Sequence, residues 1–466
     1  MDSGALAALL PEVVALIETK MPYGAAAAMA TSGLSVAVDN REQQATRDPE
    51  SAGVVLTASN GLYLEEYATS TLDRAGLLAE AAAWVAGLEV KSGANPITID
   101  PGPALREEFA TPVRLDPATV PLQDKFERVT TRQARAKALD PRVANATVRY
   151  NEAYQQTVFA NRNRVLQQKL TRLRLVTSLL VRDSNGAIQH DWDILGGSVG
   201  YEIFDRAESP EYDRPLEAIR DSALALLTAE HIEPGVYDCI CAPGVSGTVA
   251  HESFGHGVET DMFLKGRARA AEFLGQRMAS DEVNMFDDPT LPAAHGSYYF
   301  DDEGTLAQPV PIIAQGVFVS GISDLYSSAR MGIARTGNGR RQAFDRKAYA
   351  RMSNTYFRPG STPVADMIAG VDHGVYLTQL DSGMEDPKNW GIQLLMHYGR
   401  EIRNGQFTGR VFSPVGMTGS VPEVLASISH VGTDFVIDPG FCGKGHKEYV
   451  RISSGGPHLR LRARLS

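Results

Sequence analysis

A long alternation of polar and apolar residues between Val143 and Leu195 constrains the fold most strongly. Alternation with a period of two puts successive side chains on opposite faces of an extended strand. The pattern breaks at 161–163 (NRN) and at 184–186 (SNG), and Asn, Ser and Gly favour turns. We therefore predict an antiparallel meander, and its many Arg and Gln side chains indicate one solvated face.

Helical patterns accompany this meander in the first half of the chain. Segments with helical spacing or composition are Leu6–Ile17, Leu77–Val85, the more polar Lys125–Leu139, and Pro215–Glu230. Ser70 or Thr71 is expected to cap the second of these helices. Asn60–Gly61 predicts a two-residue hairpin turn. The first half is therefore predicted to be α+β, with a mostly antiparallel sheet.

The second half differs in predicted secondary structure: it has short strands joined by Gly-rich segments, and few helices. The predicted strands are Val236–Cys241, Gly296–Phe300, Val310–Ser320, Ile392–Tyr398 and Tyr449–Ile452. A chain of 466 residues is long enough for two or three domains. We expect an N-terminal α+β domain at 1–232, with candidate subdomains at 1–120 and 121–232, and a β-rich catalytic domain at 233–466.

Net charge, cysteine content and hydrophobic patterning argue against several classes of protein. The 56 acidic and 45 basic side chains leave a net charge of −11, which repels phosphate backbones and argues against a nucleic-acid partner. Three cysteines cannot form the disulfide framework of a small secreted protein. No apolar run reaches the roughly 18 residues that a membrane helix needs. We expect a cytoplasmic protein without a membrane segment.

The segment 246–257 (SGTVAHESFGHG) contains two histidines that flank a glutamate. Two neutral imidazoles can hold a metal ion, and a carboxylate beside them can deprotonate a water. His251 and His256 are five residues apart, so a regular α-helix would place their rings about 140° apart. A wide π-type turn at Ser253–Gly255, which Gly255 would permit, brings both rings to one face. The alternative is a helix end whose histidines bind backbone carbonyls.

A catalytic zinc site usually has three protein ligands, so a third residue is required. Candidates from the sequence are Glu259, Asp261, His295, Cys442 and His446. Glu259 lies near the line of His256 on the same helix, and could instead orient an imidazole. Cys442 is followed by Lys444, a cation that favours the thiolate. The residue pattern leaves these alternatives open.

Several segments together resemble one known family. The segment 251–259 (HESFGHGVE) is similar to the signature of the TldD/PmbA (modulator of gyrase) metallopeptidases, and specifically to the TldD-type subunit. Further matching segments follow in order: 296–297 (GS), 301–305 (DDEGT), 336–341 (TGNGRR), 351–356 (RMSNTY), the hairpin 399–405, and 442–444 (CGK). The resemblance is strong over 235–466 and looser before it.

This resemblance implies a function and a site. It implies one Zn²⁺ held by His251, His256 and Cys442, with Glu252 as the general base, in a peptidase that degrades unfolded peptides or trims leader peptides. It also implies a dimer with a PmbA/TldE-like subunit, and a homodimer is the other possibility. Unlike the usual pattern, Ser253–Phe254 follows the glutamate and 445–447 (GHK) follows the cysteine segment. These differences bear on the substrate more than on the metal.

Other readings of the same residues remain open. Arg340 and Arg341 could clamp a substrate carboxylate, or they could form an exposed basic turn. A Cys442/His446 nucleophile pair would indicate a thiol hydrolase, but it would leave the two motif histidines without a role. Two further alternatives are an amide hydrolase for a small natural-product biosynthetic intermediate and a metal-stabilised, non-catalytic partner subunit.

Overall fold

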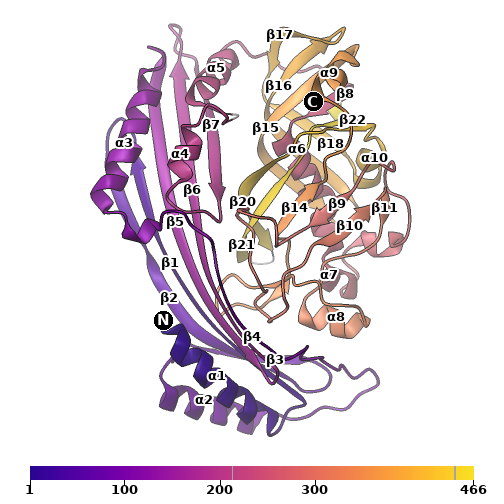
Figure 1. Cartoon of the computed structure of the whole chain (residues 1–466). Coiled ribbons are helices and arrows are strands. Elements are labelled where there is room, and N and C mark those ends of the chain that lie inside the picture. Colours follow the sequence, from indigo (N-terminus) through magenta and orange to yellow (C-terminus); the bar gives the residue numbers. More distant parts are fainter. Residues whose placement is uncertain (213, 445–447) are drawn as a thin grey trace.

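The protein is α+β, as predicted, and its two halves lie side by side (Figure 1). The computed structural model describes residues 1–212, 214–444 and 448–466. Long strands from the first half form one twisted sheet, in indigo to magenta. The second half, in rose through orange to yellow, consists mainly of shorter strands that are more compactly arranged. This arrangement leaves an interface between a long sheet and a β-rich body.

The first sheet has the order β3-β2-β1-β5-β6-β4, and β7 pairs with β6. Its strands are β1 (Tyr23–Val38), β2 (Gln43–Ser59), β3 (Leu64–Thr69), β4 (Leu105–Ala110), β5 (Val143–Asn161), β6 (Arg164–Arg182) and β7 (Ile188–Gly197). The consecutive pairs β5–β6 and β6–β7 are antiparallel. The predicted meander is therefore confirmed, with both turns at the expected segments.

Both faces of this sheet are covered over part of its length. The helices of this half are α1 (Ser3–Glu18), α2 (Arg74–Gly87), α3 (Leu122–Ala138), α4 (Ile203–Ala207) and α5 (Leu216–Leu226), with a 3₁₀ turn at Pro117–Thr119. Ala26 and Ala28 of β1 pack in the core beneath α1 and α2. Ala25 and Ala27 face the other way and join a core cluster that includes Phe300 of the second half. Small side chains in β1 thus allow layers on both of its faces.

Four local predictions need correction. The predicted strand Val310–Ser320 is instead a hairpin of two short antiparallel strands, Val310–Ala314 and Val317–Phe318. Asp73, rather than Ser70 or Thr71, caps α2, because its carboxylate accepts the Gly76 N–H at 2.9 Å. The hairpin turn spans 60–63 rather than two residues. The segment Gly296–Phe300 is irregular rather than a strand. Its backbone bonds to side chains of β6 instead: Gln168 donates to the Phe300 carbonyl at 3.0 Å.

The second half contains a small barrel and a separate sheet. The barrel strands follow the order β15-β8-β22-β18-β16, and β15 also pairs with β16, which closes the ring. They are β8 (Gly235–Cys241), β15 (His373–Asp386), β16 (Gly391–Arg403), β18 (Val415–Ser420) and β22 (Leu459–Leu465), with β17 (Gln406–Phe412) and β19 (His430–Val431) attached. The β-rich prediction for this half is confirmed.

The separate sheet has the order β11-β10-β9-β14-β21-β20. Its strands are β9 (Met285–Asp287), β10 (Val310–Ala314), β11 (Val317–Phe318), β14 (Asn354–Phe357), β20 (Val436–Lys444) and β21 (Glu448–Gly456), and β12 (Gly339–Arg340) pairs with β13 (Tyr349–Ala350) nearby. The α-helices are α6 (Pro243–Thr248), α7 (Thr260–Leu264), α8 (Leu325–Met331), α9 (Val364–Ala369) and α10 (Val421–Ala426). α6 packs against both β15 and β21, so it joins the barrel to the sheet.

Candidate metal centre

His251 lies on a π-helix, Val249–Gly255, that continues from α6, and His256 directly follows the last residue of this helix. The wider turn of a π-helix compensates for the five-residue spacing, and the predicted distortion at Ser253–Gly255 is present. A 3₁₀ turn, His256–Val258, follows immediately. His251 is buried and His256 partly buried, and their ring centroids are 5.1 Å apart. The two imidazoles therefore face the same small space.

Glycine permits the close packing of this helix. A Cβ atom at Gly255 would lie 2.1 Å from Met352 Sδ, and one at Gly247 would lie 2.2 Å from the Gly455 nitrogen. Real Cβ atoms do not approach other atoms so closely. The helix thus lies directly against β21 and the segment that leads into β14, and this contact sets the position of both histidines.

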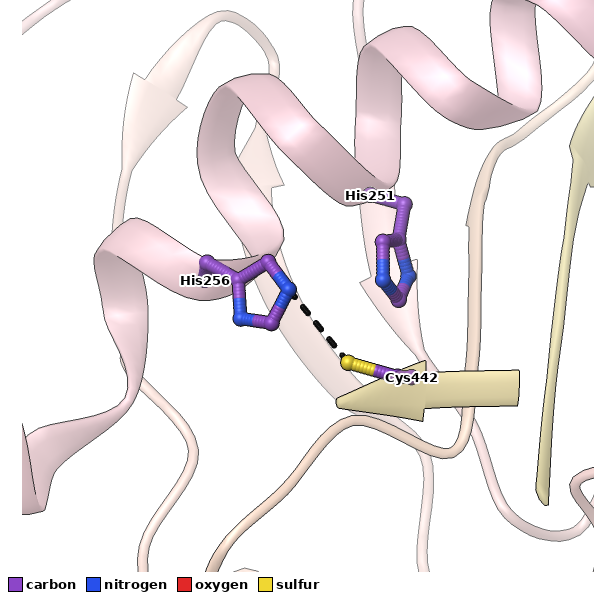
Figure 2. A group of neighbouring side chains, drawn as sticks. All are labelled: His251, His256 and Cys442. Atoms are coloured by element: carbon purple, nitrogen blue, oxygen red, sulfur yellow. Dashed lines mark hydrogen bonds between the residues drawn. The ribbon is translucent and has the colours of Figure 1, made fainter. Parts of the chain in front are cut away.

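Cys442 enters the same space from β20 (Figure 2). Its Sγ lies 3.3 Å from His256 Nε2. One donor atom from each of His251, His256 and Cys442 lies within 4.8 Å of the others. His251 Nδ1 is buried and has no hydrogen-bond partner among the residues that the structure describes. Two imidazole nitrogens and one thiol sulfur form a donor set that suits zinc.

Electrostatics favour the ligand form of the thiol. Burial alone would raise the pKa of Cys442, but the adjacent His256 and His251 reverse this effect and hold the pKa well below its usual value. Burial likewise tends to lower the pKa of His256, yet the Cys442 thiolate and Glu259 raise it well above normal. Both shifts favour the thiolate of Cys442, which is the form of cysteine that binds a metal.

Glu259 supports the site from behind His256. Its carboxylate lies 3.6 Å from His256 Nδ1, 3.0 Å from Lys444 Nζ and 3.7 Å from Arg351 Nε. Burial opposes ionisation of Glu259, but Lys444, His256 and Arg351 together lower its pKa to about 2. The geometry matches the role of orienting an imidazole, which the sequence had left open. Asp261 binds Lys444 Nζ at 2.7 Å.

Arg351 connects the helix to the strand that carries the cysteine. This side chain is 1% exposed, and one of its guanidinium nitrogens donates to the Cys442 carbonyl at 2.6 Å. The same guanidinium faces Glu259. From the sequence, the segment of Arg351 was noted only as part of a resemblance, and Lys444 only as a cation close to Cys442. Their distance in sequence from His256 left no local signal of an ion-pair network.

The remaining predicted ligand candidates are not part of the donor group. His295 is 2% exposed and packs against the ring of Phe441 at 5.8 Å. His446 lies outside the described residues. Within the described ranges, the only three-residue His/Cys/Asp/Glu group with donor atoms this close is His251, His256 and Cys442.

Glu252 and His251 line a large cleft of about 1050 Å³ between the two halves. One wall is Trp192–Gly196 of β7, and another is Val436–Phe441 of β20. Strand β15 packs against the stem of Glu252, since a Cβ at Gly383 would lie 2.8 Å from Glu252 Cγ. The Glu252 carboxylate has neither a hydrogen bond nor an ion pair within the described part of the chain. It is therefore available to a molecule in the cleft.

Arg340 and Arg341 lie elsewhere, beside a second cavity that His251 and Glu252 do not line. Both are buried, so the alternative of an exposed basic turn is wrong. Arg341 forms an ion pair with Glu66 of β3 at 2.9 Å. Arg340 donates to main-chain carbonyls and lies over the ring of Tyr298 at 4.9 Å. Of the two, Arg340 is the one without a carboxylate partner among the described residues.

Comparisons with known proteins agree with this picture. The sequence profile of the PmbA/TldA metallopeptidase C-terminal domain matches residues 234–464. A metalloprotease of Methanothermobacter thermautotrophicus is 31% identical over 347 residues, 74% of each chain. A zinc metalloprotease TldD homolog of Saccharolobus solfataricus is 26% identical, covering 73% of this chain and 75% of that protein.

Two solved structures have a similar fold over almost the whole chain. A candidate modulator of DNA gyrase from Thermotoga maritima has a TM-score of 0.76 at 18% identity, covering 98% of both chains. TldE from Thermococcus kodakarensis has a TM-score of 0.71 at 14% identity, covering 98% of this chain and 99% of its own. No helix in the described part of the chain is both long and apolar enough to cross a bilayer.

Proposed function

Because the chain belongs to the TldD/PmbA family of metallopeptidases, we propose that it hydrolyses peptide bonds with a single Zn²⁺ held by His251, His256 and Cys442. The main support for this proposal is that one donor atom of each of these residues lies within 4.8 Å of the others. When bound, zinc supplies Lewis acidity that polarises the scissile carbonyl and acidifies a water molecule. The network of Glu259, Arg351 and Lys444 keeps the donors in place.

Glu252 acts as the general base in this proposal. It follows His251 directly, lines the same cleft and has no competing partner in the described chain. Its carboxylate takes a proton from the attacking water and then passes it to the departing amine. The packing of Gly383 against its stem limits the directions in which the carboxylate can point.

The substrate is an unfolded peptide or a peptide-like molecule. β7 and β20 each lie at an edge of their sheets in the described topology, and both line the cleft. Edge strands offer free main-chain groups that can pair with an extended peptide of any sequence. A folded domain would not enter this space, so it should resist cleavage.

A second subunit is also part of the proposal. The similarity of this fold to TldE supports pairing with a TldE-like chain, and a homodimer is the alternative. Light scattering of the purified chain, alone and mixed with a TldE-like protein from the same genome, distinguishes the two arrangements. A mass of one chain in both samples would exclude both.

The Glu252→Gln variant tests the catalytic assignment. We expect it to bind one zinc per chain like the wild type, because Glu252 is not in the donor group, and to lose at least about 100-fold in kcat on an unstructured peptide. Glu272→Gln, at an exposed site, is the matched control and keeps wild-type activity. Activity retained by Glu252→Gln would contradict the general-base role.

A further inference from the structure

A second cavity of about 330 Å³ lies between the first sheet and the second half. Ser32 and Arg172 line it from the first half, and Arg340 and Arg451 line it from the second. Phe441 lines both this cavity and the large cleft, and it directly precedes Cys442 in β20. The cavity therefore begins one residue from the candidate metal centre.

Three arginines that line this cavity form no ion pair with a carboxylate in the described part of the chain. Within residues 1–212, 214–444 and 448–466, no carboxylate lies within 4.0 Å of the guanidinium of Arg172, Arg340 or Arg451. Arg172 and Arg340 are 3% and 7% exposed, and they donate to main-chain carbonyls, which hold them in place but do not neutralise them. The Arg451 guanidinium has no hydrogen bond to a described residue. It lies 5.8 Å from the ring of Phe441, and Arg174 lies 5.1 Å from the same ring.

Buried His295 lies beside this group of arginines. Neither of its ring nitrogens has a hydrogen-bond partner among the described residues, and its ring contacts that of Phe441. Burial, together with the positive charges of Arg172 and Arg451, lowers the pKa of His295 well below its usual value. Burial and Arg451 also lower the pKa of Arg172. Asp302 and Asp48 partly offset these positive charges at Arg172 and Arg451. The described residues that line the cavity include four arginines and three aspartates, so guanidinium groups outnumber carboxylates in its wall.

Three carboxylates of the described chain also line the cavity, and none of them forms an ion pair with Arg172, Arg340 or Arg451. Asp302 accepts the Arg341 N–H at 2.8 Å, and Asp301 accepts the Gly339 N–H at 2.9 Å. Asp48 is exposed to solvent. These acids form no ion pair with Arg172, Arg340 or Arg451 among the described residues, and the guanidinium of Arg451, which also makes no hydrogen bond there, is the group most available to a ligand.

We propose that this arginine cavity binds a carboxylate of the substrate, either an acidic side chain or the C-terminal carboxylate. The inference rests on the proposed peptidase function and adds a preference for anionic substrates. Guanidinium groups pair with carboxylates through charge-assisted, often bidentate hydrogen bonds. Because Phe441 separates the cavity from the cleft, a peptide lying along β20 can place one carboxylate there while its backbone stays beside Glu252.

Peptide kinetics test the preference. Three unstructured peptides of one sequence are compared: one with a single Glu and an amidated C-terminus, one with Gln in its place, and one with Gln and a free C-terminus. We expect one carboxylate peptide to exceed the neutral peptide in kcat/KM by about ten- to a hundredfold, mainly through KM. The peptide whose kcat/KM exceeds that of the neutral peptide shows whether the side-chain or the C-terminal carboxylate binds. Cleavage of the neutral peptide by the wild type tests the peptidase function separately.

Arg451→Gln is the informative variant, because Arg451 makes no hydrogen bond that the fold needs among the described residues. We expect its carboxylate preference to fall to about one. Arg464→Gln, an exposed arginine on β22, makes the same charge change and should keep the wild-type ratio. A wild-type ratio near one, or a preference that Arg451→Gln leaves unchanged, would overturn the proposal.

Calorimetry with glutarate provides a readout that needs no turnover. The wild type and Arg464→Gln should bind this dicarboxylate with equal affinity, and Arg451→Gln at least about tenfold more weakly. Equal affinity in all three proteins, or no binding to any of them, would contradict the carboxylate site even if the peptides are cleaved. If no peptide is cleaved, the peptidase proposal fails and the glutarate result alone decides the site.

Discussion

The candidate metal centre and the arginine cavity adjoin each other at Phe441–Cys442. Buried charges form ion pairs at the metal centre, but three of the arginines that line the cavity form none with the residues that the structure describes. At the metal centre, Glu259 meets the opposite charges of Lys444 and Arg351. In the arginine cavity, Arg172 and Arg451 have no carboxylate within 4.0 Å in the described part of the chain. In the first region a buried carboxylate is paired with cations, whereas in the second the guanidinium groups of Arg172 and Arg451 form no ion pair with a described residue.

This difference separates two uses of buried charge. A paired network costs desolvation energy but fixes the geometry of the groups it contacts, as Arg351 does for the Cys442 carbonyl. Unpaired cations cost stability in the free protein, and they recover it when an anion binds. Removing a charge should therefore have opposite effects on stability in the two regions.

The largest effect is expected from breaking the paired network. Arg351→Met leaves Glu259 with one cation fewer and frees the strand segment at Cys442, so the free energy of unfolding should fall by about 3–5 kcal/mol. Zinc affinity should fall by about ten- to a hundredfold, because residues behind the ligands fix their orientation. Urea denaturation and competition with a chelator measure the two quantities. A loss below about 1 kcal/mol would show that the network is not structural.

A second test measures how the contribution of Glu259 to stability depends on pH. The pKa of Glu259 is about 2 in the folded protein, against an ordinary value of 4.5. A lowered pKa stabilises the fold above pH 4.5, and this contribution is lost as the pH falls towards 2. The shift corresponds to about 3 kcal/mol.

Comparison with Glu259→Gln isolates this contribution. The difference in unfolding free energy between the metal-free wild type and this variant should be constant from about pH 6 to pH 4.5, where His256 is protonated in both folded and unfolded chains, and shrink below pH 4.5. Denaturation curves collected from pH 6 to the acid limit of the fold measure the difference. A difference that does not depend on pH would contradict the ionised, paired state of Glu259.

The smallest effect concerns the unpaired region and has the opposite sign. Arg451→Gln removes a cation that lacks a partner, so it should leave stability unchanged or raise it by up to about 1 kcal/mol. Thermal denaturation without a ligand, beside Arg464→Gln, measures this shift. A loss above about 2 kcal/mol would indicate that Arg451 is already compensated in the free protein.

Local patterns predicted the first half well because its structure follows from period and turn residues. The alternation from Val143 to Leu195 predicted the meander. The failure at Gly296–Phe300 has a physical cause: its backbone groups bond to Gln168 and Arg172, far away in sequence. No local pattern reports such a partner.

The candidate site was predictable in part. The five-residue spacing of His251 and His256 required a distorted helix, and the π-helix meets that requirement. Cys442 was one of several third-ligand candidates, and only the fold of β20 against the helix brings it near. Arg351 and the arginine cavity depend on contacts between distant segments, which spacing along the chain cannot report.

X-ray absorption at the zinc edge tests the central claim most directly. On the zinc-loaded protein we expect one metal per chain with two nitrogen ligands near 2.0–2.1 Å and one sulfur ligand near 2.3 Å. Cys442→Ser should remove the sulfur contribution, while Cys239→Ser, a buried cysteine outside the donor group, should leave it intact. A shell without sulfur in the wild type would contradict the account.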